Sequence, residues 1–88
     1  MARLANNDIE MNALSGAMDG EALFRLGLVY ATGRAVEIDR ISAHKWFNLA
    51  IAKGYRAATS YRQEIACEMK QDEIAEALRQ ARAYLSIH

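Results

Sequence analysis

The chain has 88 residues, of which 52% are hydrophobic and 25% are charged. Its 11 basic and 11 acidic residues give a formal net charge of zero, so no broad electrostatic field attracts nucleic acid or an anionic membrane. This length allows one small domain, and the chain contains no proline that would interrupt a helix.

The N-terminal residues are predicted to form a short helix that begins after Asn7 or Asp8, either of which suits a cap position. Its apolar positions are Ile9, Ala13, Leu14 and Ala17. Gly16 and Gly20 are expected to break this helix.

The first twelve residues, 1–12, contain one basic residue and no continuous apolar run. This composition predicts neither a secretory signal nor a membrane anchor. A single cysteine, Cys67, forms no internal disulfide and is consistent with a reducing compartment. We therefore expect a cytoplasmic protein.

A second predicted helix carries an apolar stripe from Ala22 onward, at the spacing that places side chains on one helix face. The stripe consists of Leu23, Leu26, Gly27 and Tyr30. A glycine inside a helix costs about 1 kcal/mol relative to alanine. Gly27 is therefore interpreted as a point of close approach by a neighbouring helix, the alternative being a tolerated surface glycine. The helix is expected to end at Thr32, because Gly33 can adopt the left-handed conformation common at helix ends.

A connection then runs from Arg34 to Asp39, which is predicted to cap the next helix. Val36 and Ile38 are expected to hold this connection against the core. The helix that follows is expected to end at Gly54.

The apolar stripe of this third predicted helix consists of Ala43, Trp46, Phe47, Ala50 and Ile51. The residues expected mostly on its polar side are His44, Lys45, Asn48 and Lys53. Small side chains on both sides of Trp46 and Phe47 favour a tight antiparallel pair with the preceding helix.

Over residues 21–58 this pattern resembles a Sel-one-like repeat, a relative of the tetratricopeptide repeat that stacks antiparallel helix pairs into a right-handed superhelix. The matching residues are Ala22, Leu26, Gly27, Tyr30, Gly33, Arg34, Val36, Asp39, Ala43, Trp46, Phe47, Ala50 and Gly54. Ala35 stands where the family usually has a glycine. The resemblance implies adaptor or scaffold work, in bacteria often within signalling or envelope-associated complexes.

A second, degenerate copy of the unit is predicted where Ala58 aligns with Ala22. The positions of Leu26, Gly27 and Tyr30 are taken there by Arg62, Gln63 and Ala66. A shifted apolar stripe is expected instead, formed by Ala58, Tyr61, Ile65, Ala66 and Met69. The last predicted helix carries Ile74, Ala77, Leu78, Ala81 and Leu85 on one side.

These elements predict an all-α fold: a short right-handed α-solenoid of antiparallel helix pairs, with one full repeat and a degenerate C-terminal capping pair. A single domain over 1–88 would contain a partial half-repeat at 1–19, the full repeat at 20–54 and the capping helix pair at 55–88. Solenoids generally need about three stacked units for a sufficient core, so a homodimer is also expected to be feasible.

Catalytic chemistry is not indicated by the titratable residues. Cys67 has only His44 and His88 as imidazole partners, and a buried or half-buried thiol is favoured over a nucleophile. These residues lack zinc-ligand spacing, and Glu64 with Glu68 is interpreted as a solvated pair. We expect no enzyme activity, no cofactor and no metal.

The leading functional hypothesis is a protein-interaction module that binds a peptide or protein on the groove side of its first helices. The candidate partner-binding residues are Arg25, Leu28, Val29, Thr32, Tyr55 and Arg62. Leu28 and Val29 are either an exposed apolar patch or ordinary core, and the pattern leaves both open. The alternative function is a structural unit that dimerises through exposed repeat ends. Neither hypothesis involves nucleic acid or a membrane.

Overall fold

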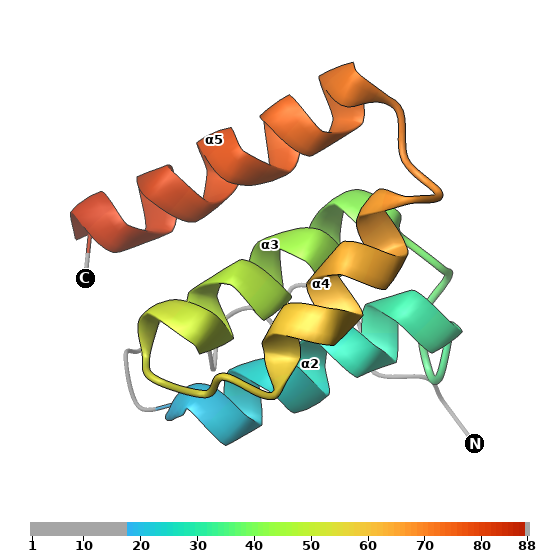
Figure 1. Cartoon of the computed structure of the whole chain (residues 1–88). Helices are drawn as coiled ribbons and strands as arrows, with labels where there is room; N and C mark the ends of the chain where they lie inside the picture. The colour runs from blue at the N-terminus through green and yellow to red at the C-terminus, as the bar shows by residue number, and fades with distance from the viewer. Residues whose placement is uncertain (1–17, 88) are drawn as a thin grey trace.

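The computed structural model describes residues 18–87, which form four α-helices and no strand (Figure 1). The helices are α2 (Gly20–Thr32), α3 (Arg40–Ala52), α4 (Ala58–Ala66) and α5 (Gln71–Ile87). The predicted all-α class is confirmed for this part of the chain. The short helix predicted after Asn7 or Asp8 lies outside the described residues.

Helix α2 begins after Asp19, whose carboxylate accepts a hydrogen bond from the Ala22 N–H at 2.9 Å. Gly33 follows its last residue with a φ of 74°, and its N–H donates to the Val29 carbonyl at 3.0 Å. The predicted end at Thr32 is therefore confirmed. Gly20 is the first residue of α2, where Asp19 supplies the cap; the preceding helix that Gly20 was expected to break lies outside the described residues.

Helix α3 begins after Asp39, as predicted. One carboxylate oxygen of Asp39 accepts from the Ser42 N–H at 3.1 Å, and the other accepts from the Ser42 hydroxyl at 2.8 Å. At the other end Gly54 has a φ of 94°, and the Tyr55 N–H donates to the Ala50 carbonyl at 3.0 Å. This bond and the left-handed glycine form the arrangement that often ends helices.

Three contacts fix how α2 lies against α3. A Cβ placed on Gly20 would lie 2.8 Å from the Cβ of Tyr55, so the start of α2 meets the segment after α3. A Cβ on Gly27 would lie 2.5 Å from the Phe47 ring, so the middles of the two helices touch. The Asp39 N–H donates to the Tyr30 carbonyl at 3.0 Å, next to the connection. The predicted close approach at Gly27 is confirmed.

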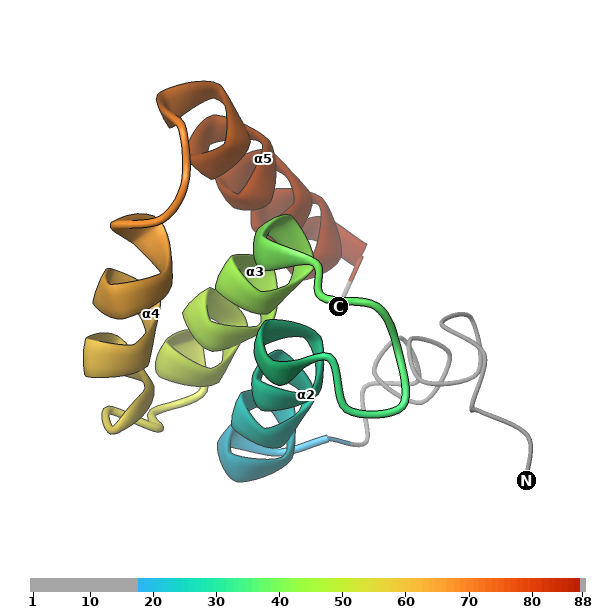
Figure 2. The same cartoon turned by 90° about the vertical axis from the view of Figure 1, so that its right-hand side faces the viewer.

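Helix α3 lies at the centre of the molecule and packs against α2, α4 and α5 (Figure 2). His44 and Lys45 are consequently only 4% and 9% exposed, so their predicted placement on a polar side of α3 is wrong. The Lys45 ammonium nitrogen lies 4.2 Å from the centroid of the Trp46 ring, which compensates part of the cost of burying a charge. A pattern of one apolar and one polar face assumes that half of the helix is exposed to solvent. Because α3 packs against three other helices, its solvent-exposed face is narrower than that.

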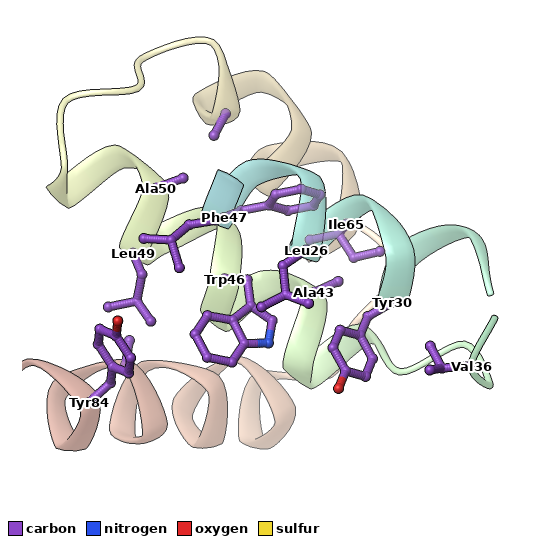
Figure 3. Close-up of a cluster of buried hydrophobic side chains, with 13 residues drawn as sticks. Leu26, Tyr30, Val36, Ala43, Trp46, Phe47, Leu49, Ala50, Ile65 and Tyr84 are labelled. Atoms are coloured by element: carbon purple, nitrogen blue, oxygen red, sulfur yellow. The ribbon is translucent and has the colours of Figure 1, made fainter. Parts of the chain in front are cut away.

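The buried core is built around the side chains of α3 (Figure 3). Phe47 extends toward α2, whereas Trp46 packs edge-to-face on Tyr84 of α5, with ring centroids 5.6 Å apart. The core residues are Leu23, Leu26, Tyr30, Val36, Ala43, Trp46, Phe47, Leu49, Ala50, Ala58, Ile65, Ala81 and Tyr84. Val36 holds the connection against this core as predicted, but Ile38 is 55% exposed, so its predicted core role is wrong.

The last two helices bury fewer residues than α2 and α3. In α4 Ile65 is buried as predicted, whereas Tyr61 keeps 41% of its surface exposed and Met69 lies beyond the helix end. Cys67 follows α4 and is exposed, so the predicted burial of its thiol is wrong. In α5 Tyr84 is buried, whereas Leu85, predicted on the apolar side, is 46% exposed.

Candidate functional site

The outward face of α2 carries most of the predicted partner-binding residues. Leu28 and Val29 are half-buried at the edge of the core, so they are neither fully exposed nor ordinary core. The Thr32 hydroxyl donates to the Leu28 carbonyl one turn earlier, at 2.7 Å. Arg25 is exposed and pairs with Glu21 at 2.7 Å.

A hollow of about 260 Å³ separates this face of α2 from α4. Phe47 and Ile65 contribute buried apolar surface to it, and Leu28 stands on the α2 side. Its lining residues are Leu28, Ala31, Thr32, Phe47, Tyr61, Glu64, Ile65 and Glu68. We call this hollow the α2–α4 groove.

A second hollow of about 240 Å³ shares Leu28 and Thr32 with the α2–α4 groove. Its described lining residues are Arg25, Leu28, Val29, Thr32 and Arg34. The structure thus brings four of the six predicted site residues together around one stretch of α2.

Tyr55 and Arg62 line neither hollow. The Tyr55 ring packs on Phe24, with centroids 5.1 Å apart, and Arg62 donates a hydrogen bond to the side-chain carbonyl of Asn48. Both side chains therefore support packing within the domain: Tyr55 contacts α2, and Arg62 joins α4 to α3.

The α4 side of the groove was missed as a binding surface. Tyr61 and Ile65 were assigned to a core stripe, and Glu64 with Glu68 to a solvated pair. The spacing of these residues could have indicated the surface, because residues four apart share a helix face. In addition, an incomplete repeat leaves part of its apolar stripe uncovered by a neighbouring unit. Tyr61 illustrates this. Its ring packs edge-on against Phe24, with ring centroids 4.9 Å apart, while 41% of the residue stays exposed.

The groove is acidic on its α4 side. Glu64 and Glu68 line it, and its described lining contains no lysine, arginine or histidine. The Glu68 carboxylate accepts from the Arg40 guanidinium at 3.0 Å, and both side chains are exposed. Within residues 18–87 Glu64 has no ion pair and no hydrogen bond through its side chain.

No catalytic arrangement emerges from the described residues. Burial, followed by the positive charge of Arg62, lowers the pKa of His44, so this imidazole is neutral at pH 7. Within residues 18–87 no three or more histidine, cysteine or acidic residues are grouped so that they could hold a metal ion. In the same range no helix has both the length and the apolarity to cross a membrane.

No family model, curated protein or solved structure matches this chain. The resemblance to the Sel-one-like repeat therefore stays a prediction that rests on the residues quoted for it.

Proposed function

We propose that the chain is a protein-interaction module of the Sel-one-like kind, in which antiparallel helix pairs stack as a short right-handed solenoid. The contacts of Gly20, Gly27 and Tyr30 with successively earlier parts of the α3 region support an antiparallel first pair. On this proposal α2 and α4 are the first helices of successive units, so the groove between them is the binding surface.

The observation that carries the proposal is the α2–α4 groove itself. Its lining combines apolar and polar residues, as surfaces that bind proteins commonly do. We call the apolar residues Leu28, Ala31, Phe47 and Ile65 its floor, and the polar residues Thr32, Glu64 and Glu68 its rim. Its volume of about 260 Å³ is below the 300–1,000 Å³ typical of small-molecule sites. A side chain presented by a peptide or protein is therefore a better match than a whole small ligand.

The test is selection of a displayed library of random short peptides on the purified chain. Leu28→Asp places a charge in the groove and should abolish recovery of the peptides that the unchanged chain selects. Leu85→Asp makes the same substitution at an exposed position on α5 and should leave recovery unchanged. Circular dichroism must show equal helicity for both variants. Equal recovery by Leu28→Asp and the unchanged chain would contradict the proposal.

A second candidate function is self-association, favoured by the exposed apolar side chains at the end of α5. Leu85 is 46% exposed and Ile87 is 72% exposed. On this alternative two copies cover these side chains, and Leu85→Asp would convert a dimer to a monomer. Light scattering over a range of concentrations separates the two candidates, because a monomer at every concentration excludes obligatory dimerisation.

A further inference from the structure

We infer that the segment recognised in the α2–α4 groove presents an apolar side chain next to a lysine or arginine. This inference rests on the proposed function and adds the chemical class of the partner. It follows from the floor of the groove, from the charges of its rim and from the exposed ring of Tyr61.

The apolar floor of the groove favours binding of an apolar side chain of the partner. Phe47 is 1% exposed and Ile65 is 8% exposed, yet both contribute to the lining, so core side chains border the hollow. Leu28 and Ala31 add apolar surface on the α2 side. An apolar side chain bound there removes apolar surface from water on both partners, which favours association.

The acidic residues of the rim favour a positively charged side chain of the partner. Glu64 and Glu68 are the charged residues of the described lining, and they carry the same sign. Glu64 has no partner cation within residues 18–87, and Glu68 has only an exposed pair with Arg40. Exposed ion pairs contribute little to stability, so Glu68 can exchange Arg40 for a partner's cation at small cost. Complementary charge raises the rate and specificity of association.

Tyr61 offers the same cation a second contact. Its ring lines the groove beside Glu64, and contacts with Phe24 and Phe47 hold it in place, at centroid distances of 4.9 and 6.0 Å. Because 41% of Tyr61 is exposed, part of the ring is open to a guanidinium or ammonium group. An acidic partner finds neither contact, since the described lining of the groove holds no lysine or arginine and the neighbouring Arg40 is paired with Glu68.

The test repeats the peptide selection with two charge-reversal variants. Glu64→Lys reverses a charge in the groove, whereas Glu37→Lys makes the same change in the exposed connection before α3. The unchanged chain and Glu37→Lys should both select peptides enriched in lysine or arginine beside an apolar residue, and Glu64→Lys should lose this enrichment. For one selected synthetic peptide, Glu64→Gln should weaken binding about two- to fivefold, and added salt should reduce this difference.

The outcomes separate this inference from the proposed function. Peptides that need Leu28 but show no preference for lysine or arginine would overturn the inference and leave the groove as a binding site. The same loss of preference in Glu37→Lys and Glu64→Lys would also overturn it, because net charge alone would then explain the selection. Failure to select any peptide that depends on Leu28 would overturn both.

Discussion

The first two described helices and the last two are stabilised in different ways. Helices α2 and α3 have 13 residues each, and each is preceded by an aspartate whose carboxylate accepts a hydrogen bond from a backbone N–H. Helix α4 has 9 residues, no side-chain cap and two buried residues, Ala58 and Ile65. Helix α5 is longer, with 17 residues, but buries only Ala77, Ala81 and Tyr84.

This difference indicates that α2 and α3 form the framework and that α4 and α5 depend on it. Both later helices pack against α3, and most of the buried aromatic surface belongs to α2 and α3. The groove therefore has one well-supported wall, α2, and one wall with fewer anchors, α4. Substitutions at the contacts between the two regions measure how far each depends on the other.

The largest effect is expected for Trp46→Ala, because this side chain joins the framework to α5. Trp46 is 1% exposed and packs on Tyr84, so its truncation leaves a cavity between α3 and α5. We expect the free energy of unfolding to fall by about 3–5 kcal/mol, a large fraction of the stability of a small domain. Urea denaturation followed by circular dichroism measures it. A loss of less than about 1 kcal/mol would show that α5 does not depend on this contact.

A smaller loss is expected for Gly27→Ala, within the framework. Alanine improves helix propensity by about 1 kcal/mol, but its Cβ would lie 2.5 Å from the Phe47 ring, which is buried and cannot move aside freely. Overpacking of this kind costs about 1–3 kcal/mol, so we expect a net loss of about 1 kcal/mol.

The control for this loss is Gly27→Ala combined with Phe47→Leu. If the steric conflict is its cause, alanine at position 27 should be less damaging in the Phe47→Leu background than in the unchanged chain. The comparison is made by chemical denaturation of all four proteins in the cycle. A more stable Gly27→Ala protein would contradict the close packing of α2 on α3.

Prediction from sequence worked best where a residue meets one neighbour. The caps at Asp39 and Gly33 depend on local backbone geometry, and Gly27 meets the Phe47 ring of α3, so residue spacing was sufficient. It failed for His44 and Lys45, because the number of helices around α3 is a tertiary property that a single helix pattern does not contain.

The groove was only half predicted for a related reason. Leu28 and Thr32 were identified because they lie beside the stripe of α2, which has a clear period. Tyr61 lies on a helix with a degenerate pattern, where one apolar side chain both packs on the core and lines the surface. A pattern that divides residues into core and solvent cannot assign such a position.

A pH-dependent effect is expected at the contact between α3 and α4. Burial lowers the pKa of His44 below its usual value of 6.5, so the unfolded chain binds a proton at a higher pH than the folded chain does. Neutral His44 thus contributes to the free energy of unfolding above pH 6.5. This contribution is lost as the pH falls from 6.5 toward the folded-state pKa. Denaturation between pH 7 and pH 5 should show falling stability, and His44→Gln should reduce this dependence.

The matched control is His88→Gln, because His88 is the other histidine of the chain. This variant should keep the pH dependence of the unchanged protein. If His88→Gln removes the dependence and His44→Gln does not, burial of His44 is not its origin.

The smallest effect is expected for Ala35→Gly, in the connection between α2 and α3. Ala35 has a φ of 69°, a left-handed conformation that costs an L-residue about 1–2 kcal/mol. Glycine removes this cost but loses about 0.4–1 kcal/mol through the greater freedom of the unfolded chain. We therefore expect a gain of about 0.5 kcal/mol in chemical denaturation. Destabilisation would show that the side chain of Ala35 contributes more than its backbone conformation costs.

The role of the groove is tested most directly by an NMR titration of the labelled chain with a peptide selected on it. We predict that the amide signals of Leu28, Thr32, Tyr61 and Ile65 shift together and saturate with one binding constant, while those of Leu85 and Ile87 stay unchanged. Shifts confined to the end of α5, with none in the α2–α4 groove, would contradict the account.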